Sequence, residues 1–469
     1  MTERVLVLGA DGAGMSAAHQ ALRVAARTGR RLEVVVLERS GHTSYSACGL
    51  PYWLAGDVAS GDALVARTAA EHRERGIDLR LGAEAVGIDL DRRRVSVRYV
   101  DGAAGDEPFD QLVVATGSRA AVPPWALAAD GRPVPGVRAL RTLDDGAAWL
   151  ATLEGAAGRQ PRTGVVAGGG YIGLETAEAF LRRGLDTTLV TRGEVMGSLD
   201  PDMGARVRQE LVKAGVTVLH GSEVDGVDVG AGGAVAAVLA GAHRIPADVV
   251  ALGLGAVPNS GIAAEAGLAV GSFGGLLPDA RQQVADGVWA AGDCCESTER
   301  HGGRRVYVPL GTHANKQGRV AGENLAGGDV RFAGVLGTAI TGFAAGGVHV
   351  EIGRTGPTLA QAAEVAADLV SLVTESSTSA GYMPQSSPIA VKVLADRRSR
   401  RLIGMQIVGG PGSGKRIDTA AAAIWGGMTV DDVAAMDLSY APPFSPVFDP
   451  VQIACRRTAD LLDGDSAGR

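Results

Sequence analysis

The stretch GADGAG at residues 9–14 decides the fold, together with a second stretch, GGGYIG, at residues 168–173. Each follows a short apolar run, Val5 to Leu8 or Thr163 to Ala167, that predicts a buried strand. A helical stretch and a further apolar run come next in both places, so each segment predicts a β-α-β unit. Glycines let the backbone approach a pyrophosphate, and a helix N-terminus offers free N–H groups. The chain is therefore predicted to contain two dinucleotide-binding folds.

The first glycine motif is an imperfect match to the G-x-G-x-x-G pattern. Glycines stand at Gly9, Gly12 and Gly14, but Asp11 replaces the middle glycine of the pattern. The second strand of this unit ends at Glu38, whose carboxylate can accept hydrogen bonds from a ribose diol. By itself, this motif is equally compatible with an incidental glycine-rich turn.

The second motif has glycines at all three required places, Gly168, Gly170 and Gly173. Its second strand ends at Thr191 and is followed by Arg192, with no acidic residue at the ribose position. A basic side chain there suits a 2′-phosphate, so NADPH is expected to be preferred over NADH. The alternative is that Arg192 points into solvent.

The strand predicted at residues 287–293 ends in Gly292 and Asp293. This ending would place a carboxylate within reach of the ribityl hydroxyls of a flavin. One nucleotide fold would then hold a flavin dinucleotide permanently, and the other would admit a nicotinamide cofactor transiently.

Cys48 lies in the segment SYSACGLPY at residues 44–52. Pro51 suits the first turn of a short helix predicted over Tyr52 to Ala55. A cysteine just ahead of a helix N-terminus feels the positive end of the dipole, which is expected to lower its pKa. The alternative is a buried structural cysteine. Because no second cysteine stands nearby, Cys48 would cycle through a mixed disulfide, a persulfide or a sulfenic acid.

The composition limits the classes of function. A net charge of −7 argues against a nucleic-acid-binding surface. Four cysteines in 469 residues do not predict a disulfide framework or a metal site, and Cys294, Cys295 and Cys455 are interpreted as packing residues. The sequence predicts neither a signal peptide nor a membrane span, so a cytoplasmic location is expected. The polar tail from Asp463 is expected to be frayed.

The chain resembles the coenzyme A–disulfide reductase branch of the single-cysteine FAD-dependent pyridine nucleotide–disulfide oxidoreductases. The matching segments are residues 44–52, 115–118, 168–175, 291–293, 309–319 and 440–451. The resemblance implies an α/β fold with two Rossmann-like dinucleotide-binding domains and an α+β C-terminal dimerisation domain. The FAD domain would comprise residues 1–122 and 253–330. An NAD(P)H domain at residues 123–252 would be inserted between these two parts, and residues 331–469 would form the dimerisation domain. It also implies a homodimer whose partner subunit completes the active site.

The resemblance implies three catalytic residues: Cys48, Tyr440 reaching across the dimer, and Tyr382, next to which Met383 replaces a family tyrosine. No metal is implied. The expected cofactor-binding residues are Gly9, Gly12, Gly14, Glu38, Arg39, Ser44, Thr116, Gly117, Gly168, Gly170, Tyr171, Ile172, Gly173, Glu175, Arg192, Gly255, Gly292, Asp293, Pro309, Gly311, Thr312 and Ala314.

The expected activity is NAD(P)H-dependent reduction, with FAD as cofactor, of coenzyme A disulfide or a related persulfide or polysulfide. A second hypothesis is an oxidase or peroxidase that uses a cysteine sulfenic acid. Members of that branch carry a histidine in the first glycine turn, where this chain has Gly12. A hypothesis of another class is a flavin-based redox sensor. The sequence leaves the physiological substrate open.

Residues 409–415 match the phosphate-binding pattern G-x-x-x-x-G-K, which would indicate a nucleotide hydrolase. The hydroxyl residue that such a site needs next is replaced by Arg416. A glycine-rich turn in the dimerisation domain is the better interpretation.

Overall fold

The first nucleotide fold is built on a six-stranded sheet in the order β18-β19-β7-β1-β2-β3. The computed structural model describes residues 2–155, 160–364 and 368–467. The strands of this sheet are β1 (Glu3–Leu8), β2 (Leu32–Glu38), β3 (Ile77–Leu81), β7 (Gln111–Val114), β18 (Gln283–Ala285) and β19 (Val288–Ala290). β1 pairs in parallel with β2 and β7, and its apolar residues are fully buried, as expected for a parallel strand covered on both faces.

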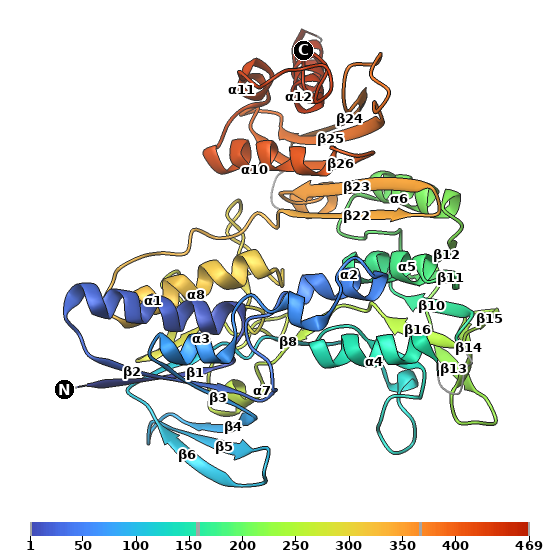
Figure 1. Ribbon diagram of the computed structural model, residues 1–469. Coiled ribbons are helices and arrows are strands. Elements are labelled where there is room, and N and C mark those ends of the chain that lie inside the picture. The colour runs from blue at the N-terminus through green and yellow to red at the C-terminus, as the bar shows by residue number, and fades with distance from the viewer. Residues whose placement is uncertain (1, 156–159, 365–367, 468–469) are drawn as a thin grey trace.

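Two helices cover one face of this sheet, and a small sheet covers the other. Helix α1 (Gly12–Thr28) connects β1 to β2 and packs along α8 (Gly311–Leu325). Figure 1 shows these two helices side by side above the sheet. The small antiparallel sheet comprises β4 (Ala83–Asp89), β5 (Arg94–Tyr99) and β6 (Ala104–Pro108). The glycine turn at residues 9–14 therefore lies at the carboxyl edge of the large sheet.

The second nucleotide fold lies between β7 and β18 in the chain. Its parallel sheet has the order β12-β11-β10-β16-β9. The strands are β9 (Val137–Ala139), β10 (Thr163–Ala167), β11 (Asp186–Thr191), β12 (Thr217–His220) and β16 (Val249–Leu252). The helices are α4 (Leu143–Glu154), α5 (Tyr171–Arg182) and α6 (Pro201–Lys213), and β13 (Gly226–Val229), β14 (Val235–Ala240) and β15 (His243–Pro246) form a small antiparallel sheet. β8 (Ser118–Ala120) pairs with β17 (Ala256–Pro258) where the chain enters and leaves this fold.

The C-terminal part is an antiparallel sheet with helices, in the order β22-β23-β26-β25-β24. Its elements are β22 (Ala339–Ala345), β23 (Val348–Thr355), β24 (Leu369–Ser377), β25 (Pro388–Asp396), β26 (Leu402–Gly409), α10 (Ile417–Gly426), α11 (Val430–Ala435) and α12 (Pro450–Ala467). The prediction that the tail is frayed from Asp463 is wrong for residues 463–467. Helix α12 continues through these residues, and Arg400 Nη1 lies 2.8 Å from Asp463 Oδ1. The predicted fold class is confirmed by these three sheets.

The shorter elements are α2 (Leu50–Ala55), α3 (Ala69–Glu74), α7 (Gly261–Glu265), α9 (Leu359–Ala363), β20 (Ser297–Thr298) and β21 (Arg305–Val306). Among them, α2 lies where all three parts of the molecule meet. One hydrophobic cluster joins Leu50 of α2 to Trp149 of α4, Phe180 of α5 and Phe343 of β22. This cluster fixes the segment that carries Cys48.

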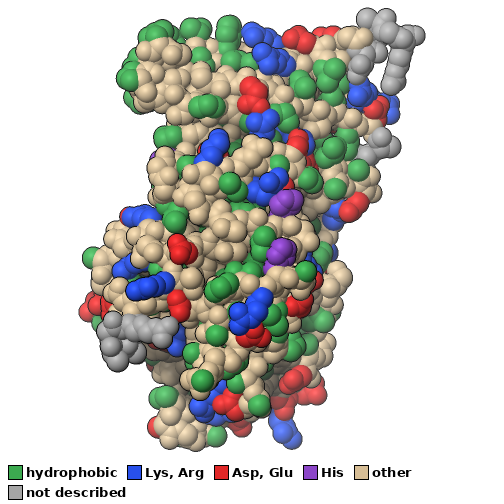
Figure 2. Space-filling model, turned by 90° about the vertical axis from the view of Figure 1, so that its right-hand side faces the viewer, with side chains coloured by type: hydrophobic (Ala, Val, Ile, Leu, Met, Phe, Trp, Pro, Cys, Tyr) green, Lys and Arg blue, Asp and Glu red, His purple; other side chains and the backbone are tan. Residues whose placement is uncertain are grey.

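Three observations concern the helices, the charges on one face and possible metal ligands of the described residues. Within the described ranges, no helix combines the length and the apolar character needed to cross a bilayer. On the face shown in Figure 2, basic and acidic side chains are interspersed. In the described part of the chain, no cluster of three or more His, Cys, Asp or Glu side chains is arranged to hold a metal ion.

Candidate active site

Three cavities lie end to end along the carboxyl edge of the first sheet, with volumes of about 250, 150 and 300 Å³. Gly9 and Glu38 line both the first and the second cavity, and Asp11 and Tyr45 line both the second and the third. The three cavities therefore form one continuous groove, called here the long groove. Cys48 lines its third cavity.

Most residues predicted for the first nucleotide site lie along this groove. The first two cavities are lined by Gly9, Glu38, Arg39, Thr116 and Gly117, and the third by Gly12, Cys48, Gly117, Gly292, Asp293, Pro309, Gly311 and Ala314. Gly14 is buried beneath the turn. The long groove thus gathers predicted residues from segments that are far apart in the sequence.

Backbone N–H groups hold the Glu38 carboxylate between the first and second cavities. Oε2 accepts a hydrogen bond from the Ala10 N–H at 3.0 Å, and Oε1 accepts one from the Ser40 N–H at 2.8 Å. Gly9 has a φ of +105°, and a Cβ atom on it would lie 2.3 Å from the Ala115 carbonyl oxygen. Only glycine fits there, which brings the backbone close to any group bound in the groove.

Arg141 is a groove residue that the sequence reasoning missed. It precedes α4 and lines the second and third cavities. Its Nη2 lies 2.6 Å from Asp293 Oδ2, and the Ser118 hydroxyl also donates to that oxygen at 3.1 Å. Asp293 is therefore held in the turn that follows β19, where it lines the same cavity as Cys48.

Cys48 lies in a short 3-10 turn, Ala47–Gly49, directly before α2. Its side chain is exposed to the third cavity of the long groove. Burial by the surrounding protein, followed by the nearby Glu175 carboxylate, raises the pKa of the Cys48 thiol, while Arg141 acts in the opposite direction. The predicted lowering of this pKa is wrong, because desolvation and the negative charges nearby, Glu175 first among them, raise it.

Glu175 reaches the cysteine region from α5 of the second nucleotide fold. Thr341 of β22 donates a hydrogen bond to Glu175 Oε1 at 2.8 Å. Burial raises the pKa of Glu175 to about 7, although this hydrogen bond opposes the rise. Burial, together with the Glu175 carboxylate, also raises the pKa of Tyr52 in α2 to about 12. The charge beside Cys48 therefore changes near neutral pH.

The second glycine turn repeats the construction of the first. A Cβ atom on Gly168 would lie 2.3 Å from the Gly253 carbonyl oxygen, and one on Gly173 would lie 1.9 Å from the Gly168 oxygen. On Gly14, the matching atom would lie 1.9 Å from the Gly9 oxygen. A Cβ atom on Gly170, by contrast, would meet no atom within 4 Å. Protein packing requires Gly168 and Gly173, whereas Gly170 leaves open space that a pyrophosphate can approach.

The remaining predicted residues of the second site lie around this turn. Tyr171 and Ile172 begin α5, and the Ser198 hydroxyl lies 3.3 Å from the Tyr171 hydroxyl. Gly255 follows β16, next to the second turn. Arg192 follows β11 and is exposed, with its Nη1 3.8 Å from Glu223 Oε1. A basic side chain therefore stands beyond the strand end, accompanied by an acidic one.

A further cavity of about 480 Å³ adjoins the long groove near Cys48. It shares Asp11, Tyr45 and Ser46 with the third cavity of the groove. Its walls include four arginines, Arg23, Arg67, Arg75 and Arg319, so we call it the arginine cavity. Ser44, predicted to contact the cofactor, lines this cavity and not the long groove.

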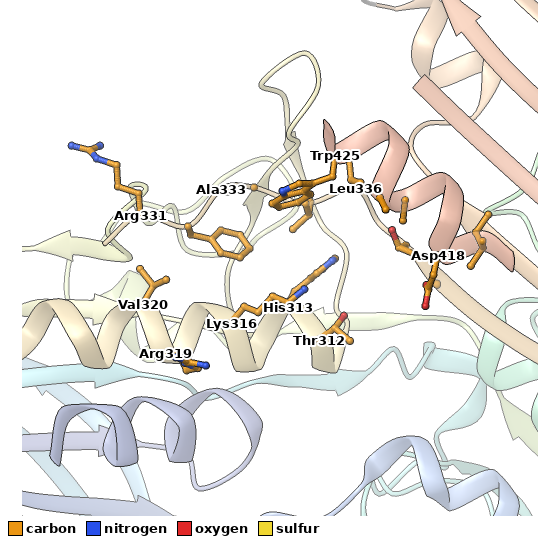
Figure 3. A pocket seen from close by; sticks show the side chains of 18 of the residues that line it. Thr312, His313, Lys316, Arg319, Val320, Arg331, Ala333, Leu336, Asp418 and Trp425 are labelled. Atoms are coloured by element: carbon orange, nitrogen blue, oxygen red, sulfur yellow. The ribbon is translucent and has the colours of Figure 1, made fainter. Parts of the chain in front are cut away.

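Three other predicted residues also face away from the long groove. Thr312 lies on the opposite side of α8, in a cavity of about 810 Å³ between α8 and α10. Figure 3 shows Lys316 and His313 of α8 below Trp425 of α10 in this cavity. Tyr440 and Tyr382 interact with each other on the C-terminal part, are 48% and 76% exposed, and do not line the cavities around Cys48.

The phosphate-loop-like segment at residues 409–415 holds a carboxylate of the protein itself. The N–H groups of Gly412 and Gly414 donate to Glu351 at 3.0 and 2.7 Å. The anion-binding backbone of this turn is thus occupied by a side chain from β23, which supports its interpretation as a structural turn.

Comparison with known proteins shows which family this chain resembles. Residues 3–318 match the profile of the pyridine nucleotide-disulphide oxidoreductases, and residues 347–451 match that family's dimerisation domain. The chain is 35% identical over 461 residues to the NAD(P)H coenzyme A polysulfide/persulfide reductase of Pyrococcus horikoshii, covering 97% of this chain and 98% of that protein.

Two further relatives bear on the hypotheses drawn from the sequence. An NADH oxidase of Methanocaldococcus jannaschii is 31% identical over 454 residues, covering 96% of this chain and 97% of that protein. The solved structure of an NAD-dependent persulfide reductase from A. fulgidus has a TM-score of 0.90 and 33% identity, covering 98% of this chain and 84% of that one.

Proposed function

The chain belongs to the pyridine nucleotide-disulphide oxidoreductase family, and from this premise we propose that it reduces disulfides or persulfides of coenzyme A with NAD(P)H. Cys48 is the residue that exchanges sulfur bonds with the substrate. The observation that carries the proposal is the arginine cavity, which opens beside Cys48.

The arginine cavity suits one end of coenzyme A, and Cys48 suits the other. Coenzyme A carries several phosphate charges at its nucleotide end and a thiol at the end of a long flexible arm. Guanidinium groups bind phosphates through paired hydrogen bonds, and four of them surround this cavity. The shared wall at Tyr45 and Ser46 leads from the arginines to the cavity of Cys48. A phosphorylated thiol bound in this way would present its sulfur to the cysteine.

The long groove fits FAD, the cofactor that this family uses. Glu38 stands where a ribose would bind, the Gly9 turn admits a pyrophosphate, and Asp293 faces the cavity of Cys48. When bound, FAD accepts hydride from NAD(P)H and delivers electrons to sulfur. Arg141 contributes a positive charge beside Asp293 that also favours the thiolate of Cys48.

Arg192 favours NADPH over NADH in this proposal. Its guanidinium stands beyond the end of β11, where a 2′-phosphate would lie. Glu223, 3.8 Å away, weakens the preference by competing for the same guanidinium. We therefore expect activity with both nucleotides and a moderate advantage for NADPH.

In the chemical step, the Cys48 thiolate attacks one sulfur of the disulfide and displaces the other as a coenzyme A thiolate. The remaining coenzyme A stays on Cys48 as a mixed disulfide. Reduction of this disulfide by two electrons releases the coenzyme A thiolate and restores the Cys48 thiolate. In the proposed homodimer, Tyr440 of the second copy donates a hydrogen bond to the departing thiolate.

The proposed homodimer also accounts for exposed apolar side chains on the dimerisation domain. Tyr440, Phe444 and Phe448 are 48%, 77% and 50% exposed, and they follow one another in a single segment. An exposed aromatic cluster of this kind is typical of a protein interface. All four cysteines are free, which suits the reducing cytoplasm as a location.

The Cys48→Ser variant tests the proposed function. We expect it to retain bound flavin and reduction by NADPH, but to lose turnover of coenzyme A disulfide. The Cys455→Ala variant, which removes a buried thiol far from the groove, serves as the control and should retain turnover. Turnover of coenzyme A disulfide that survives in Cys48→Ser would sink the proposal. Rapid NADPH consumption with oxygen alone would support the oxidase hypothesis instead.

A further inference from the structure

A chain of hydrogen bonds runs behind the wall of the arginine cavity. Ser44, on the wall, lies with its Oγ 2.9 Å from His72 Nε2, and His72 Nδ1 lies 2.9 Å from His19 Nε2. His72 of α3 is fully buried, whereas His19 of α1 lines the cavity. Residues from three segments thus connect the cavity surface to a buried imidazole.

Arg67 determines the direction of this chain. Its Nη1 lies 3.3 Å from His19 Nε2, and a guanidinium can only donate, so Nε2 of His19 is the accepting nitrogen. In the tautomer that this contact favours, the one lone pair of His19 Nε2 is shared between Arg67 and the Nδ1–H of His72, 2.9 Å away. In the neutral His72 ring, Nε2 consequently carries no proton, and the Ser44 hydroxyl donates to it. The hydroxyl hydrogen points into the protein.

This direction is unfavourable for an anionic ligand. With its hydrogen donated to His72, Ser44 presents only oxygen lone pairs to the cavity, and a phosphate oxygen needs a donor. One proton on His72 Nε2 reverses the bond. The protonated ring then donates to Ser44 Oγ, and the hydroxyl hydrogen is free to turn toward the cavity.

We propose that His72 and His19 are specificity-determining positioning residues that take up a proton when a phosphate-bearing ligand binds, and so turn the Ser44 hydroxyl into a donor toward that ligand. The proposal rests on the function proposed above, because it takes the arginine cavity as the site of the phosphorylated end of coenzyme A. One proton moves from solvent to the imidazole pair, and no covalent bond to the ligand forms or breaks.

Burial, and after it the charges around the pair, explain why the proton is absent before the ligand binds. Burial lowers the pKa of His19 and of His72 to about 4. The charges of Arg67 and Arg75 lower the pKa of both rings as well. Arg23 adds to this effect at His19, and the neighbouring ring adds to it at His72. Glu71 of α3 opposes the lowering at His72. A bound anion would offset the charge of these arginines and raise both pKa values.

Isothermal titration of coenzyme A into the FAD-loaded protein tests this proposal. The number of protons taken up is obtained by repeating the titration at about pH 7 in buffers of different ionisation enthalpy. The wild-type protein is expected to take up more protons per ligand than His72→Gln, by up to about one. Proton loss from the ligand's own phosphate is common to both proteins and cancels in the difference. His243→Gln, at an exposed position in another domain, should match the wild type.

The affinity should show the same linkage. Binding to the wild type is expected to tighten as the pH falls from about 8 to about 6, and this slope should flatten in His72→Gln. His19→Gln, on the cavity wall, repeats the test if the buried His72→Gln variant does not fold. Equal proton uptake in the wild type and either folded variant overturns the proposal. If coenzyme A does not bind at all, the proposed function fails, and inorganic pyrophosphate as ligand then decides the proton linkage by the same criterion.

Discussion

Arg141 Nη2 lies 2.6 Å from Asp293 Oδ2, although the two residues are 152 positions apart in the chain. The contact joins the residue ahead of α4 in the second nucleotide fold to the end of β19 in the first. Both side chains line the cavity that contains Cys48. The pair therefore ties the two nucleotide folds together at the point where their cofactors would meet.

The Arg141→Gln variant is expected to raise the pKa of Cys48 further, because the wild-type guanidinium lowers it. Alkylation of the cysteine by iodoacetamide, measured against pH, reports this pKa directly. The same variant should bind FAD more weakly, by about tenfold if one charged hydrogen bond is lost. Arg119→Gln, on the first cavity of the groove, is the control and should leave the alkylation profile unchanged. An unaltered profile in Arg141→Gln would contradict the prediction.

The Glu175→Gln variant is expected to lower the pKa of Cys48, because the charged carboxylate raises it. In the wild type, Glu175 ionises at about pH 7, so the effect should be present above that pH and fade below it. Alkylation rates of the two proteins should therefore converge under mildly acidic conditions. Glu154→Gln, at the exposed end of α4, is the control. Rates that differ equally at all pH values would show that the charge of Glu175 is not the cause.

The carboxyl group of Glu175 also makes the stability of the folded protein depend on pH. Its pKa is raised from 4.5 in the unfolded chain to about 7 in the folded protein, so folding favours the neutral acid. This contribution is complete below about pH 4.5 and is lost as the pH rises through about 7. Denaturant unfolding at a series of pH values should show Glu175→Gln gaining stability relative to the wild type over that interval.

Two alanine substitutions in one turn should affect different properties, nucleotide binding in one variant and stability in the other. Gly170→Ala is expected to preserve the fold and weaken NAD(P)H binding, because its Cβ would occupy open space where a pyrophosphate approaches. Gly173→Ala is expected to reduce the free energy of unfolding by about 2 kcal/mol, since its Cβ would lie against a carbonyl oxygen. Thermal unfolding and nucleotide titration distinguish the two. Full nucleotide affinity in Gly170→Ala would refute the assignment of this turn.

The preference for NADPH should depend on Arg192. Arg192→Ala is expected to lower kcat/KM for NADPH by about tenfold, or ~1.4 kcal/mol, and to change the value for NADH little. Glu223→Gln should raise kcat/KM for NADPH, because it frees the guanidinium from a competing carboxylate. Steady-state rates with both nucleotides check both variants. A proportional loss for NADH in Arg192→Ala would indicate a role unrelated to the 2′-phosphate.

The parts of this molecule that sequence reasoning predicted are those set by neighbouring residues. The two glycine turns, their flanking strands and the position of Cys48 before a short helix all follow from local pattern. The predicted fold class is confirmed: local patterns predicted the two nucleotide folds, and the resemblance to the family implied the dimerisation domain.

The features that were missed depend on contacts between distant segments. The four arginines of the arginine cavity come from α1, α8 and the two ends of α3, and each looks like an ordinary surface charge in the sequence. Ser44 stands in the cysteine segment, but its hydroxyl is turned toward His72. The predicted direction of the Cys48 pKa shift was wrong because burial of the thiol, and after it the Glu175 carboxylate from another fold, raise this pKa. No local pattern contains these relations.

The position of the Cys48 thiol depends on packing around α2 that involves several parts of the chain. Leu50 belongs to one hydrophobic cluster with side chains of α4, α5 and β22, and α2 contacts α4 and α5 directly, so a fragment lacking the second nucleotide fold would leave the cysteine helix without this support. Genetic recombination that exchanged one unit for a relative's would have to conserve this contact or lose the enzyme. This arrangement favours evolution of the two nucleotide folds and the dimerisation domain together, without exchange of single domains.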